Sequence, residues 1–178
     1  MTNFSGMIEA EGAGFGGPCK AFEPWMSVFE EANIAPEPFF ASVGLDLDYV
    51  QNPDNVVPWE TWVACVEKME DALGGRGAFE RYFRIGQTVS GLQSMQILKK
   101  FAGLFASPAF LFRVLWRWFG PSTFPGIRAK LDQVDRHTMR GSIEIPADWR
   151  DSPPFFRLNR ALMIDAPIIV GASPARIE

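Results

Sequence analysis

The chain has few side chains that could carry out catalysis. Its single histidine, His137, lies in a short polar stretch between two runs of alternating apolar residues, and no serine or cysteine is predicted near it. Histidine must lie within hydrogen-bonding reach of a nucleophile to activate it, so this arrangement does not favour acyl transfer. Carboxylate pairs such as Asp46 with Asp48 fall in solvated segments, where a paired general acid and base are not expected. The sequence therefore predicts a protein that is not an enzyme.

Metal and cofactor sites are also not expected. The two cysteines, Cys19 and Cys65, are far apart in the sequence and belong to no CxxC pair, so neither a disulfide framework nor a zinc site is predicted. A single histidine leaves a nitrogen-rich metal site short of ligands. The pattern GxGxxG formed by Gly12, Gly14 and Gly17 follows a poor strand and precedes a proline, unlike a dinucleotide-binding turn.

Aromatic side chains are what the sequence supplies in quantity. They make up 13% of the chain and include six tryptophans and sixteen phenylalanines. They are densest over residues 96–120, where the apolar side chains are too many to face one narrow core, so part of this surface should contact a ligand, a partner or a bilayer. We predict an apolar pocket lined by Phe105, Phe112, Trp116 and Phe119, with Arg113 orienting an acidic or polar group. Core packing and dimerisation use the same residue types and are open alternatives.

Length and composition predict one domain. The chain has 178 residues, 47% of them hydrophobic, which suffices for a sizeable core. No block of lysines and arginines is present, so nucleic acid is not expected as a direct ligand. The sequence has neither a secretory signal nor an apolar stretch of roughly 18 to 20 residues. Together with the unpaired cysteines, this favours a cytoplasmic location.

Helices are predicted in the first two thirds of the chain. Apolar residues recur at helical spacing in four segments, at 20–33, 36–43, 58–74 and 79–89. Residues 96–120 are typical of a helix pair or a kinked helix, divided at Pro108 and capped there by Ser107. Residues 1–19 are rich in glycine and predict a flexible arm, so the domain is expected to span 20–178.

The C-terminal third predicts a small sheet. Apolar residues alternate over 127–135 and again over 138–146, with a short polar turn between, as in an antiparallel hairpin. A helix follows, beginning near Pro153, and residues 175–178 begin a third alternating run. We therefore expect an α+β fold with a helical N-terminal part and a sheet built from hairpin, helix and final strand. The chain is expected to continue beyond Glu178, where that strand has no room to finish.

Two segments resemble a known family. The stretch PWETWVACVEKMEDALGG, with GLDLDYVQNPDN before it, resembles the helical part of bacterial sensory domains found ahead of histidine kinases, notably in myxobacteria-like proteins. It also looks like the effector-binding domain of some AraC-type regulators. The segment EIPADWRDSPPFFRLNRALMIDAPIIVGASPARIE is similar to the close of those sensory domains. The resemblance covers roughly residues 22–178 and implies a fold like heme nitric-oxide-binding and four-vinyl-reductase domains.

What the resemblance implies about function is a non-catalytic input domain. Such a domain would bind a small apolar or amphipathic ligand, or a partner output domain, and pass the signal on. Heme is not expected, because the heme-binding branch uses a helical histidine and a Tyr-x-Ser-x-Arg motif. Tyr49 and Tyr82 lack the serine and arginine at that spacing, and His137 lies in a turn.

Other functions compete with the sensory one. The aromatic stretch could make a homodimer or dock another protein, and the whole chain could be the effector-binding domain of a transcription regulator. Peripheral attachment to a membrane is a further alternative, with basic flanks at Lys99, Lys100, Arg113 and Arg117.

Overall fold

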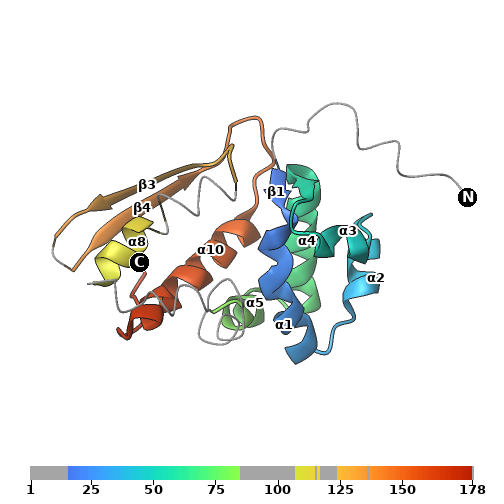
Figure 1. Cartoon of the computed structure of the whole chain (residues 1–178), viewed down its shortest axis with the longest axis horizontal. Coiled ribbons are helices and arrows are strands. Elements are labelled where there is room, and N and C mark those ends of the chain that lie inside the picture. Colours follow the sequence, from blue (N-terminus) through green and yellow to red (C-terminus); the bar gives the residue numbers. More distant parts are fainter. Residues whose placement is uncertain (1–15, 85–106, 115, 117–123, 136, 178) are drawn as a thin grey trace, which may run out of the picture.

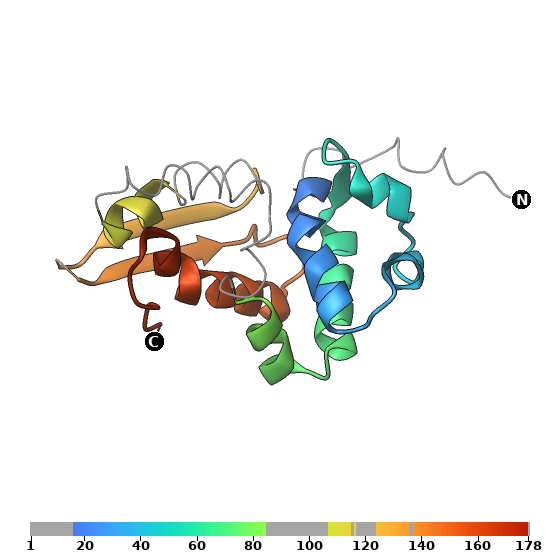
Figure 2. The same cartoon turned by 60° about the horizontal axis from the view of Figure 1, so that its bottom comes forward.

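The computed structural model describes residues 16–84, 107–114, 116, 124–135 and 137–177 (Figure 1). Helices form the N-terminal part of the molecule, and a long β-hairpin forms the opposite end. Helix α10 (Pro153–Asp165) runs between these two parts, as two views of the molecule agree (Figures 1 and 2). The fold is therefore α+β, as predicted from helical spacing in the first two thirds of the sequence and alternating apolar residues in the last third.

The N-terminal part is built from short helices. In chain order they are η2 (Cys19–Phe22), α1 (Glu23–Glu31), α2 (Pro36–Ala41), α3 (Leu47–Gln51), α4 (Trp59–Ala72) and α5 (Arg76–Tyr82). Prolines stand in the first turn of α1 and α2, where the missing N–H costs no hydrogen bond. The side chain of Asp46 caps α3 by accepting from the backbone N–H of Asp48 at 2.8 Å. Helix α3 lies between the predicted helices 36–43 and 58–74, where no helix is predicted from the sequence.

Two short strands join the first described residues to the centre of the molecule. Strand β1 (Gly16–Pro18) pairs antiparallel with β2 (Val56–Pro58), and the N–H of Cys19 donates to the carbonyl of Asn55 at 2.8 Å. Residues 16–19 therefore do not belong to a flexible arm, contrary to the sequence-based expectation. The physical reason is a close backbone approach: a Cβ on Gly16 would lie 2.0 Å from the Val57 oxygen, so only glycine fits. Residues 1–15 lie outside the described part.

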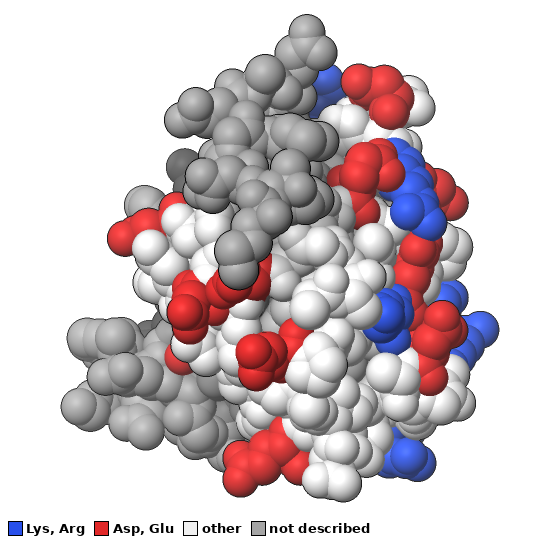
Figure 3. Space-filling model, turned by 90° about the vertical axis from the view of Figure 1, so that its right-hand side faces the viewer, with Lys and Arg blue, Asp and Glu red and all other residues white. Residues whose placement is uncertain are grey.

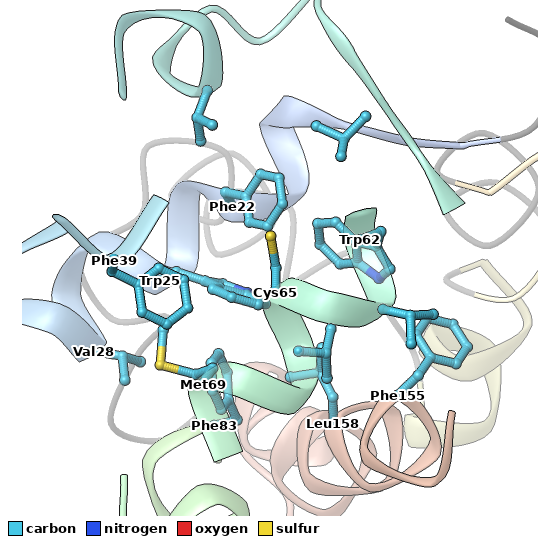
Figure 4. Close-up of a cluster of buried hydrophobic side chains, with 14 of the residues drawn as sticks. Phe22, Trp25, Val28, Phe39, Trp62, Cys65, Met69, Phe83, Phe155 and Leu158 are labelled. Atoms are coloured by element: carbon cyan, nitrogen blue, oxygen red, sulfur yellow. The ribbon is translucent and has the colours of Figure 1, made fainter. Parts of the chain in front are cut away.

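Aromatic rings fill the core between these helices. The side chains of Phe22, Trp25 and Trp62 are essentially inaccessible to solvent and contact one another (Figure 4). Their ring centroids are 4.3 Å apart for Phe22 and Trp62, and 4.9 Å apart for Phe22 and Trp25. The Trp and Met stripe of α4 faces this cluster, as its helical spacing predicts. Edge-on and tilted contacts of this kind add stability beyond the area they bury.

The predicted hairpin is confirmed. Strands β3 (Arg128–Gln133) and β4 (Met139–Glu144) pair antiparallel, with Leu131 opposite Gly141. In the connecting turn, a side-chain oxygen of Asp135 accepts from the N–H groups of His137 and Thr138, at 2.7 and 2.8 Å. These hydrogen bonds, the one from His137 first, lower the pKa of Asp135. The histidine itself is exposed in this turn, as predicted from its position.

Two helices pack beside the hairpin. Helix α8 (Pro108–Val114) begins at the predicted break, and the hydroxyl of Ser107 caps it by accepting from the N–H of Phe110 at 3.2 Å. Ser152 caps α10 in the same way through Phe155, at 3.3 Å. The helix η5 (Ala166–Val170) continues directly from α10 and packs against α8. Residues 85–106 lie outside the described part, and with them the predicted extension of the 79–89 helix.

The expected final strand is not formed, as far as the chain is described. Gly171 ends η5 in the left-handed conformation, with φ of 75°. The chain then turns back along α10, where the N–H of Ala175 donates to the carbonyl of Ile164 at 2.7 Å. Residues 172–177 have no strand pairing. The backbone of this segment thus satisfies a carbonyl at the end of α10 instead of pairing with a strand of the hairpin.

Ion pairs join the N-terminal helices to the C-terminal part. Arginines of the C-terminal part face carboxylates of α4 and α5, in the pairs Arg150–Glu67, Arg157–Glu70 and Arg160–Glu80. A fourth pair has the opposite polarity, with Arg84 beyond α5 donating two hydrogen bonds to Asp165 of α10 at 2.9 and 2.6 Å. Between these charges, Phe155 and Leu158 bury their side chains in the core. The two parts therefore share one hydrophobic core.

Candidate functional site

Three of the five predicted pocket residues fall within the described part, and Phe105 and Phe119 lie outside it. Phe112 is half-buried on α8. Arg113 is exposed, and its guanidinium donates to the side-chain oxygen of Gln133 on β3. Trp116 is half-buried against the hairpin, since a Cβ on Gly141 would lie 2.9 Å from its ring. The structure thus places Arg113 and Trp116 against the hairpin, and the pocket around them stays a prediction.

A different cavity lies at the N-terminal end of the molecule. It is an open cleft of about 340 Å³, which we call the η2–α3 cleft. Helix η2 and the start of α1 form one wall, and α3 with the turn after it forms the other. The residues that line it are Cys19, Lys20, Phe22, Glu23, Met26, Val50, Gln51 and Pro53. Its volume falls within the roughly 300 to 1,000 Å³ of small-molecule sites.

The cleft has an apolar floor and a polar rim. Cys19, Phe22 and Val50 are at most 2% exposed, and they form the floor together with half-buried Met26. Opposite charges stand at the rim, where Lys20 and Glu23 are both exposed. The exposed side chain of Gln51 adds a neutral hydrogen-bonding group. Such a surface can bury an apolar body while polar groups stay in water.

Hydrogen bonds fix the wall that α3 supplies. The hydroxyl of Tyr49 donates to the carbonyl of Val56 at 2.9 Å, and the side-chain amide of Asn55 donates to the carbonyl of Tyr49 at 2.8 Å. The first bond ties α3 to β2 and the second ties it to the residue just before β2, and β2 pairs with the strand that leads into η2. Both walls are therefore connected to the same small sheet, and the cleft is formed without a ligand.

Burial disfavours the reactive thiolate form of both cysteines. Burial raises the pKa of the Cys19 thiol to about 11. Burial raises the pKa of Cys65 to about 12, and the neighbouring Cys19 adds to the effect. Both side chains are free thiols and are at most 2% exposed. Because the thiolate is the reactive form, both cysteines are expected to be inert at neutral pH.

These raised pKa values predict a loss of stability in alkali. Each thiol stays protonated in the folded chain, whereas it ionises near pH 9 once unfolded. The two thiols therefore do not lower the free energy of unfolding below pH 9. That free energy falls as the pH rises from 9 towards 11 for Cys19 and towards 12 for Cys65. Between about pH 8 and about pH 10, Cys65 should cost the native state about 1.4 kcal/mol. Urea unfolding of wild type and Cys65→Ala at both pH values checks this, and equal losses in the two proteins would contradict it.

Sequence patterns alone did not bring the cleft residues together. Phe22 and Met26 belong to a predicted apolar helix face, but nothing in their spacing separates a cleft wall from core. Val50, Gln51 and Pro53 come from the stretch between the predicted helices 36–43 and 58–74, for which no helix is predicted. Only the packing of α3 against η2 makes these two groups neighbours.

The described residues contain neither a metal site nor a membrane-spanning helix. Within the ranges that the structure describes, no three His, Cys, Asp or Glu residues gather closely enough to hold a metal ion. None of the helices in those ranges combines the length and apolar character needed to cross a bilayer.

A scan of family models and searches of curated proteins and of solved structures find no match to this chain.

Proposed function

We propose that this chain is a non-catalytic sensory input domain that binds a small apolar or amphipathic ligand in the η2–α3 cleft. The observation that supports this proposal is the preformed cleft itself, with its apolar floor and its polar rim. The finer assignment, to domains of the heme nitric-oxide-binding-like kind that precede an output domain, is part of the same proposal and rests on the sequence resemblance described above.

A route for the signal leads from the cleft to the C-terminal part. Phe22 in the cleft floor contacts Trp62 of α4, with ring centroids 4.3 Å apart. On the same helix, Trp59 contacts Phe155 of α10, with centroids 5.1 Å apart. A ligand that favours one packing of η2 against α4 would thereby shift the position of α10 as well. The ligand must bind the two packings with different affinities for this to occur.

Binding of the neutral apolar dye Nile red tests the proposal. We expect its fluorescence to rise when it enters the cleft of wild type. The substitution Met26→Gln keeps the length of the side chain but removes apolar wall, and should weaken dye binding about fivefold. Tryptophan emission should change in parallel, because Phe22 in the floor contacts Trp25 and Trp62.

Met139→Gln is the matched control for this experiment. Met139 is also half-buried, but it lies on β4 of the hairpin, away from the cleft-lining residues. Dye binding to this variant should equal that of wild type. If Met139→Gln weakens binding and Met26→Gln does not, the dye sits elsewhere and the cleft is not the ligand site.

A further inference from the structure

We infer that the η2–α3 cleft selects cationic amphiphiles, small molecules with an apolar body and one positively charged head group. This inference rests on the proposed function, because it names the class of ligand that the same cleft would take. It follows from the distribution of charge over the N-terminal part of the chain, which the overall net charge of −4 conceals.

Charge is strongly segregated along the sequence. Between residues 16 and 75 there are eleven acidic residues against two basic ones, Lys20 and Lys68. The acidic residues are Glu23, Glu30, Glu31, Glu37, Asp46, Asp48, Asp54, Glu60, Glu67, Glu70 and Asp71. The folded N-terminal part therefore carries a large negative charge, and the compensating arginines lie in the rest of the chain.

Among the described residues, ion pairs with the C-terminal part involve two of these eleven carboxylates. Glu67 and Glu70 are the two that face Arg150 and Arg157. The other nine acidic residues are all exposed. Figure 3 shows the face of the molecule at the N-terminal helices, with acidic side chains spread over it and the basic ones gathered mostly towards one edge. This face has a negative potential that attracts cations.

The cleft opens within this acidic surface. Glu23 stands on its rim, and Asp48 and Asp54 flank the lining residues Val50 and Pro53 in the chain. All three carboxylates are exposed and belong to the elements that line the cleft or to the turn after α3, so they add to the negative potential around its mouth rather than at its floor. An apolar wall of low polarisability strengthens the field that such a head group experiences.

Among the described residues that line the cleft, Lys20 is the one with a basic side chain. By itself it would favour an anionic head group. Glu23 is also among the lining residues, and residues 16–75 carry eleven acidic residues against two basic ones, so the summed field at the mouth remains negative. Because Lys20 and Glu23 carry opposite charges on one rim, substituting each in turn tests the sign of the electrostatic potential at the mouth of the cleft.

Three amphiphiles with the same tail measure the preference. Octyltrimethylammonium, octyl glucoside and octyl sulfate carry a positive, a neutral and a negative head group. Each is titrated, below its micelle concentration, against the full chain with bound Nile red, and its affinity is read from displacement of the dye. We expect the ammonium compound to bind about fivefold more tightly than the glucoside at low salt, and octyl sulfate to bind most weakly. High salt should shrink these differences because it screens the exposed carboxylates.

Two rim variants localise the effect. Glu23→Gln should weaken octyltrimethylammonium about threefold relative to octyl glucoside, whereas Lys20→Gln should strengthen the ammonium compound by a similar factor relative to octyl glucoside. Circular dichroism and unfolding curves of both variants verify that the fold is retained. If the three amphiphiles bind equally, or octyl sulfate binds most tightly and loses affinity in Lys20→Gln, the inference is overturned while the cleft remains a ligand site. If neither the dye nor any amphiphile depends on Met26, the proposed function fails with it.

Discussion

Replacing Glu70 by leucine is expected to lower the free energy of unfolding by about 3 kcal/mol. Glu70 on α4 accepts two hydrogen bonds from Arg157 of α10, at 2.8 and 2.7 Å. The two side chains are only 15% and 21% exposed, so the substitution leaves a mostly buried guanidinium without its carboxylate. A bidentate pair of this geometry also fixes the angle at which the two helices meet. Urea unfolding followed by circular dichroism measures the change.

A second substitution separates the lost pair from lost packing. In the double variant Glu70→Leu with Arg157→Met no charge is left unpaired, and most of the stability should return. The pair of Arg150 with Glu67 is the control, because its side chains are 46% and 34% exposed and it is screened by water. Glu67→Leu should therefore cost no more than about 1 kcal/mol. If Glu67→Leu and Glu70→Leu lower the free energy of unfolding equally, the burial of the Glu70–Arg157 pair does not determine its contribution to stability.

Gly16→Ala is expected to destabilise the chain by about 3 kcal/mol, the upper end for an overpacked site. The added methyl would lie 2.0 Å from the carbonyl oxygen of Val57, a backbone atom that no change of rotamer can move. Strand β1 must then separate from β2, and the hydrogen bond from Cys19 to Asn55 weakens with it. Because η2 follows directly, binding of Nile red should fall as well. Thermal unfolding and dye titration measure the two effects.

Gly77→Ala is the control for this substitution. Gly77 lies in the first turn of α5, and within the described part of the chain nothing but its neighbours and the helix's own backbone lies within 4 Å of an added Cβ. Alanine has the higher helix propensity, so this variant should gain about 0.5 to 1 kcal/mol. An unchanged stability of Gly16→Ala would mean that the first described strand is dispensable, and that the N-terminal arm predicted from composition extends through residue 19 after all.

The charge pattern shows how much more the sequence contained than its overall composition suggests. A net charge of −4 excludes little, whereas counting by segment finds the acidic excess of residues 16–75. No structure is needed for that count. The structure adds that a cleft lies among the helices that carry this excess, and that Glu67 and Glu70 face arginines of the C-terminal part. Segment-wise charge is therefore a signal that sequence reasoning could have used.

What the sequence determined by itself is local. Helical spacing of Trp and Met predicted α4, the break at Pro108 predicted the start of α8, and alternation predicted both strands of the hairpin, because these patterns depend on neighbours a few residues apart. Only tertiary structure decided the pairing of Gly16 with Pro58, the cleft between η2 and α3, and the return of residues 172–177 to α10 instead of the sheet. Each of these depends on a contact between segments that no local period encodes, and the free energy of that contact exists only once both segments are in place.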